Sequence, residues 1–142
     1  MLSVIVFEKI GGLLREFINP ETVHRPFSNY THCVEVQNPT KFLFCSGQVP
    51  ADENGHLLPA DDFITQAEQV FKNIAAVLAN SGADLRHVVR LVTYLTRQED
   101  VSALRKILES TFGTEPPANS VVLVTGLTES SILLEVEATA VI

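Results

Sequence analysis

Two cysteines and four histidines are the side chains with the broadest chemistry here, and their spacing limits what they can do. Cys33 and Cys45 do not form a Cys-x-x-Cys pair, so reduced thiols are expected. A turn at residues 38–40 predicts a hairpin whose register places Cys33 opposite Cys45. A thiol pair could form there; the alternative is two small buried apolar side chains. The histidines lack metal-binding spacing, so we expect no metal site and place all four on the surface or in loops: His24, His32, His56 and His87.

A further candidate is the junction PPANS at residues 116–120, which precedes the apolar run 121–124. Proline cannot donate to a sheet ladder, so the two prolines predict that strand pairing stops before Asn119. Two small polar side chains then stand at the beginning of a buried strand. No Ser-His-Asp arrangement, phosphate loop or dinucleotide fingerprint occurs in the sequence.

Length and composition indicate one globular domain. The chain has 142 residues, of which 46% are hydrophobic and 19% charged. A net charge of -7 with no basic run argues against nucleic acid as a partner. The apolar run 2–7 is too short for a membrane span and lacks the features of a signal peptide, so we expect no membrane partner and a cytoplasmic protein.

Hydrophobic periodicity predicts two helices and several strands. Apolar residues recur at three- and four-residue spacing over 63–78 and again over 101–112. Asp61 and Asp62 can cap the first helix, and Gly82 and Gly113 follow the two helix ends. Strands are expected over 14–18, 31–37, 42–49, 88–95, from 121 onward, and over 134–142.

This order of elements predicts an α+β fold with one mixed sheet and both helices on one face. The predicted helices leave nothing to cover the other face of the sheet. We expect other copies of the chain to cover this face, because association buries it without a further element in the chain.

Several short segments resemble the RidA/YjgF/YER057c/UK114 family in order and spacing. They are FCSGQVP (44–50), Gln66-Ala67 with Asn73-Ile74, SGADL (81–85), Val88-Val89 with Thr93-Tyr94-Leu95, Pro117-Ala118, and LEVEA (134–138). The resemblance runs from about residue 18 to the C-terminus. It divides the chain into an N-terminal extension or first strand, 1–17, and a single RidA-like domain, 18–142.

The resemblance implies a chorismate-mutase-like fold with a mixed six-stranded sheet. It also implies a homotrimer with three clefts between subunits. The best-known members hydrolyse reactive enamines and imines to 2-oxo acids and ammonia without a cofactor. The segment containing Ser46, Gly47 and Gln48 would shape the cleft.

This chain departs from the family pattern at the positions that bind the substrate. The family motif Pro-Ala-Arg-Ser is Pro117-Ala118-Asn119-Ser120 here, so Asn119 replaces the arginine that clamps the substrate carboxylate. A neutral contact in place of a bidentate one should cost about 1.5–3 kcal/mol. Phe27 replaces a tyrosine, and Arg105 and Leu108 stand where the family usually has asparagine and tyrosine.

Glu135 and Arg105 each allow more than one interpretation. Glu135 aligns with the glutamate that positions the attacking water, and a carboxylate in a partly closed cleft can act as a general base. Alternatively, Glu135 and Glu137 occupy the solvent side of an alternating strand. Arg105 either rebuilds an anion site from the helix side, or is a solvent-exposed helical arginine next to Lys106 or paired with Glu109.

The sequence therefore carries two main hypotheses. One is an enamine or imine deaminase with altered substrate preference. The other is a non-catalytic trimer that binds a small metabolite, since sites and not folds determine function. A ribonuclease or translation inhibitor is a remote third hypothesis because the chain is acidic.

Overall fold

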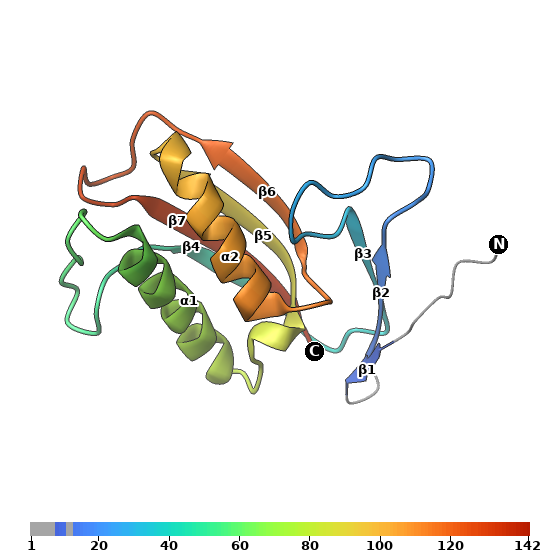
Figure 1. The fold of residues 1–142 in the computed structure, drawn as a ribbon. Coiled ribbons are helices and arrows are strands. Elements are labelled where there is room, and N and C mark those ends of the chain that lie inside the picture. Colours follow the sequence, from blue (N-terminus) through green and yellow to red (C-terminus); the bar gives the residue numbers. More distant parts are fainter. Residues whose placement is uncertain (1–7, 11–12) are drawn as a thin grey trace.

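A computed structural model describes residues 8–10 and 13–142 and shows an α+β fold (Figure 1). The helices are α1 (Phe63–Ala79) and α2 (Val101–Phe112), with single 3₁₀ turns η1 (Leu85–His87) and η2 (Gln98–Asp100). The strands are β1 (Glu8–Ile10), β2 (Leu13–Ile18), β3 (Cys33–Gln37), β4 (Phe42–Gln48), β5 (Val88–Leu95), β6 (Ala118–Leu123) and β7 (Leu134–Val141). The predicted run 2–7 lies outside the described residues.

Both predicted helices are confirmed, since each follows from a local repeat of apolar residues. The buried face of α1 repeats at helical spacing and includes Phe63, Val70 and Ile74. Asp62 caps this helix by accepting from the Thr65 N–H at 3.1 Å. Gly113 follows α2 with φ of 58°, a conformation that favours glycine, and α2 has the predicted bounds.

A four-stranded mixed sheet in the order β4-β7-β5-β6 supports the helices. Strands β5 and β6 run parallel, while β7 is antiparallel to both β4 and β5. Figure 1 shows α1 and α2 on the same face of this sheet, as the sequence predicts. The core lies between the two layers and includes Leu91, Leu104 and Val136, each almost fully buried.

The prediction of one six-stranded sheet is wrong, because the described strands form two sheets. Strands β1, β2 and β3 make a separate antiparallel sheet (Figure 1). The predicted hairpin between 31–37 and 42–49 is also wrong: β3 pairs with β2, and β4 pairs with β7. The chain end extends the second ladder, where Lys41 donates to the Ile142 carbonyl at 2.9 Å and Ile142 donates back at 3.0 Å.

This pairing separates the two thiols. Cys33 lies opposite Ile18, and Cys45 lies opposite Ala138. Both cysteines are free; Cys33 is exposed, and burial raises the pKa of the Cys45 thiol. The predicted register between the two cysteines is therefore wrong, because each belongs to a different sheet.

The sheet face away from the helices carries exposed aromatic side chains. Phe42 is 58% exposed and Phe44 is 79% exposed, and their rings stack with centroids 6.3 Å apart. Both lie on β4, an edge strand, and alternate with Leu43 and Cys45, which pack on the core. Within one chain these rings remain open to solvent, so this face is suited to burial against another surface.

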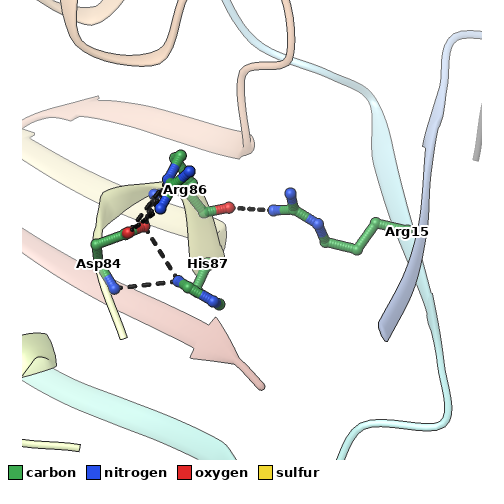
Figure 2. A network of polar contacts seen from close by, with 4 residues as sticks. All are labelled: Arg15, Asp84, Arg86 and His87. Atoms are coloured by element: carbon green, nitrogen blue, oxygen red, sulfur yellow. Dashed lines mark hydrogen bonds and ion pairs between the residues drawn. The ribbon is translucent and has the colours of Figure 1, made fainter. Parts of the chain in front are cut away.

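A polar network joins the separate sheet to the η1 turn (Figure 2). Arg15 of β2 is buried and donates to the backbone carbonyl of Arg86. Asp84 caps η1, and the Arg86 guanidinium beside it holds the pKa of Asp84 at about 2. His87 is only 8% exposed and accepts from the Asp84 N–H at 3.1 Å. The prediction that all histidines are on the surface or in loops is therefore wrong for His87, whose ring completes a capping box.

Candidate functional site

A cavity of about 260 Å³ opens between α2 and β6 and gathers four of the predicted site residues. The four are Phe27, Arg105, Leu108 and Asn119. The other lining residues are Ser28, Tyr30, Val101, Leu104 and Val121. The interior is mostly apolar, and Asn119 and Arg105 supply hydrogen-bond donors, a composition suited to a small polar molecule.

Helix α2 provides one wall of the cavity and its cation. Leu104 and Leu108 are buried one turn apart, whereas Arg105 follows Leu104 on the exposed side. Among the described residues, ion pairing in this region joins Arg97 to Asp100, and no ion pair joins Arg105 to Glu109. Arg105 therefore lines the cavity from an exposed position on α2 and, in the part of the chain that the structure describes, makes no ion pair with Glu109.

The segment before β3 forms the lip of the cavity. Asn29 donates from Nδ2 to the Leu108 carbonyl at 3.1 Å and ties this segment to α2. Phe27 is 75% exposed, and its ring stacks on His24 with centroids 4.4 Å apart. The lip therefore places an aromatic ring at the mouth, where the family tyrosine would have supplied a hydroxyl.

The remaining predicted residues lie together in a second group on β4 and β7. An added Cβ at Gly47 would lie 2.7 Å from the carboxyl carbon of Glu135, so the missing side chain of Gly47 makes room for this carboxylate. Gln48 pairs with Val136 in the ladder next to Glu135, and Ser46 is exposed two residues earlier. Gly47 and Gln48 also line a separate open cavity of about 690 Å³ beside α1.

Strand register keeps the two groups apart within one chain. Asn119 lies beside Leu91, which faces the helices, whereas Glu135 lies beside Tyr94, which alternates to the other face. Strand β5 also separates β6 from β7 in the sheet. One copy of the chain therefore does not bring Asn119 and Glu135 into one cavity.

The surroundings of Glu135 are polar and acidic. Tyr94 donates to Oε1 of Glu137 at 3.0 Å, and this hydrogen bond raises the pKa of the tyrosine above its usual value. The negative charge of Glu135 adds to the shift. Glu135 is half-buried and Glu137 exposed, so the two carboxylates differ in access to water.

Sequence reasoning missed the apolar wall and the lip. Leu104 and Val101 belong to the apolar repeat that predicts the helix over 101–112, and periodicity alone does not show that a cavity adjoins them. Tyr30 lies three residues after Phe27, and the departure from the family pattern at Phe27 was the available signal for the lip. Among the described residues, no group of three or more histidine, cysteine, aspartate or glutamate side chains is placed to hold a metal.

Comparison with known proteins identifies the family. The family model described as Endoribonuclease L-PSP matches residues 22–142. The chain is a member of this Rid family. This Rid chain is 34% identical over 129 residues to Protein DfrA of Myxococcus xanthus. The aligned region covers 91% of the chain and 97% of the relative. The chain is 29% identical over 126 residues to the 3-aminoacrylate deaminase RutC of Acinetobacter baylyi, covering 89% of the chain and 97% of the relative.

A solved structure of the same Rid family is similar over almost the whole chain. The Rid protein YyfB of Yersinia pestis, whose function is unknown, has a TM-score of 0.81 and 36% sequence identity. The similarity covers 90% of this chain and 98% of that one. Neither helix of this Rid chain among its described residues is long and apolar enough to cross a membrane.

Proposed function

We propose that this Rid protein hydrolyses small reactive enamines or imines that carry a carboxylate. The observation that carries the proposal is the presence of Asn119 and Arg105 in one cavity with an apolar wall. Arg105 supplies from α2 the positive charge that the family motif supplies from β6, and Asn119 adds a neutral donor. The relative named 3-aminoacrylate deaminase supports this class of substrate.

The proposed chemistry needs a water molecule and a base. Water adds to the imine carbon, and the resulting carbinolamine loses ammonia to leave a 2-oxo acid. Glu135 orients the water and accepts its proton, which then passes to the leaving nitrogen. The space that Gly47 leaves beside β4 supports this role, because the Glu135 carboxylate lies in it, close to the β4 backbone.

The proposal also includes a cytoplasmic homotrimer with clefts shared between subunits. Asn119 and Glu135 face opposite sides of one sheet, so a second copy must bring its Glu135 group to the cavity. The exposed rings of Phe42 and Phe44 support burial of the sheet face against other copies. Two free cysteines fit a reducing compartment.

The test generates 2-imino acids with an amino-acid oxidase and measures their hydrolysis as protection from trapping by semicarbazide. We expect the wild type to protect and Glu135→Gln to lose most of this activity. Glu137→Gln is the matched control, because it removes a neighbouring carboxylate on the same strand. Absence of protection by the wild type, or activity of Glu135→Gln equal to that of the wild type, would contradict the proposed deaminase activity.

A non-catalytic metabolite-binding protein is the second candidate. The neutral side chain of Asn119 in place of an arginine favours it, since the charged donor that the family motif presents from β6 is missing here. Thermal shift with 2-oxo acids and neutral amides distinguishes the two, because a bound ligand raises the melting temperature by mass action. Stabilisation without turnover would favour the binding protein.

A further inference from the structure

Thr93 is a polar residue in the apolar layer between the sheet and the helices. Its side chain is fully buried on β5, between Leu91 and Leu95 on the same face. A hydroxyl in such a place destabilises the fold unless it is hydrogen-bonded. A threonine here therefore needs a hydrogen-bond partner, and the identity of that partner indicates the role of the residue.

The partner of Thr93 is the side chain of Asn119. The hydroxyl Oγ1 donates to Oδ1 of Asn119 at 3.2 Å, across the parallel pair of β5 and β6. An asparagine amide has one acceptor oxygen and one NH₂ donor group. The Thr93 hydroxyl uses one of the two lone pairs of the oxygen and so fixes which end of the amide faces β5, which leaves the NH₂ end to donate to the cavity that Asn119 lines.

We propose that Thr93 is a positioning residue that fixes Asn119 as a hydrogen-bond donor toward the cavity. The cavity then selects ligands by an acceptor atom, a carboxylate or carbonyl oxygen, and disfavours ligands that present an N–H at this point. Without the hydroxyl, the amide of Asn119 is free to turn by half a rotation and present its oxygen instead. The ligand class rests on the proposed function, whereas the orientation of Asn119 does not.

The first measurement follows Asn119 directly. In protein labelled with ¹⁵N-asparagine, the side-chain NH₂ signals of Asn119 are identified by their loss in Asn119→Asp. Thr93→Val removes the hydroxyl at nearly constant volume, and Thr93→Ser keeps the hydroxyl but removes the methyl group. We expect the Asn119 signals to move in Thr93→Val and to stay near their wild-type positions in Thr93→Ser.

The second measurement is affinity for 2-oxobutanoate, a probe that offers only acceptor oxygens. We expect about a 3- to 10-fold weaker affinity in Thr93→Val and nearly wild-type affinity in Thr93→Ser, the range for one neutral hydrogen bond. Melting curves of both variants show that each is folded before the spectra are compared.

The outcomes separate this inference from the deaminase proposal. Unchanged Asn119 signals in Thr93→Val, or equal shifts in both variants, would overturn the positioning role. Moved signals in Thr93→Val alone, with no binding of 2-oxobutanoate by the wild type, would support the positioning role and count against the proposed function.

Discussion

Replacing Asn119 with arginine tests the site most sharply, because it restores the family's guanidinium at its usual position. The side chain projects into a cavity of about 260 Å³ that Arg105 already lines. If the cavity binds a substrate carboxylate, a second planar cation on β6 should strengthen that contact.

The expected gain follows from the added contact to the carboxylate. A bidentate, charge-assisted contact exceeds a neutral one by about 1.5–3 kcal/mol. Asn119→Arg also removes the hydrogen bond from the buried Thr93 hydroxyl, which lowers the stability of the free and the substrate-bound protein alike and therefore does not enter the change in kcat/KM. The value of kcat/KM for 2-imino acids should therefore rise roughly 10- to 150-fold.

The assay is the oxidase-coupled trapping reaction with wild type, Asn119→Arg and Asn119→Gln as the neutral control. Asn119→Gln should not exceed the wild type. The double variant Thr93→Val/Asn119→Arg should match Asn119→Arg in kcat/KM and melt at a higher temperature, because it also removes the unpaired hydroxyl. Equal kcat/KM values for Asn119→Arg and Asn119→Gln would refute carboxylate binding in this cavity.

Three further predictions concern the residues that hold the fold and the cavity. Gln66 is fully buried; its amide donates to three backbone carbonyls and accepts from the Leu133 N–H. Gln66→Leu should therefore lower the free energy of unfolding by about 3 kcal/mol in urea titrations. A loss under 1 kcal/mol would contradict this anchoring role. Asp84 has a folded-state pKa of about 2, below its usual 3.8, so its carboxylate stabilises the fold above pH 4 and this contribution is lost as the pH falls toward 2. Asp84→Asn should therefore cost about 1 kcal/mol at pH 6, after solvent screening of a half-exposed group, and nearly nothing at pH 2; a cost independent of pH would show that charge is not the cause. Asn29→Ala frees the lip from α2 and should weaken 2-oxobutanoate binding about 3-fold in calorimetry, with little change in melting temperature; unchanged affinity would show that the lip does not contact the ligand.

The sequence predicts the helices of this protein well and the strand partners poorly. Helix α2 has its predicted bounds, because its apolar repeat and the glycine behind it are local signals. The residues around Asn38 also give a local turn signal, and Asn38 does turn with φ of 56°. A turn does not fix which strands pair, and β4 gains its ladder from β7, at the far end of the chain.

Buried polar residues mark another limit of sequence reading. Thr93 lies within a β-branched run, and nothing in that run indicates that its hydroxyl bonds Asn119 on the next strand. The spacing of His87 from the other histidines gave no signal that its ring is buried. The partner of Thr93 depends on how β5 pairs with β6, and the burial of His87 depends on what packs around η1; both are properties of the assembled fold.

The candidate site shows the same division. Family resemblance named Asn119, Arg105, Leu108 and Phe27, and the fold gathers these four around one cavity. The residues of the second group, on β4 and β7, could be predicted from the segments LEVEA and FCSGQVP. Their separation from the first group could not be predicted from those segments. That separation follows from the register that places Asn119 beside Leu91 and Glu135 beside Tyr94.

Mixing two variants in one assembly tests the proposed trimer and its shared cleft most directly. Glu135→Gln is combined in equal amounts with the double variant Arg105→Ala/Asn119→Ala, and the hydrolysis of 2-imino acids by the mixture is compared with that of each variant alone. If each cleft takes one group from each of two subunits, random mixing leaves about one quarter of the clefts intact and should restore about one quarter of wild-type activity. Activity of the mixture no greater than the average of the two variants would contradict a site completed by a second copy.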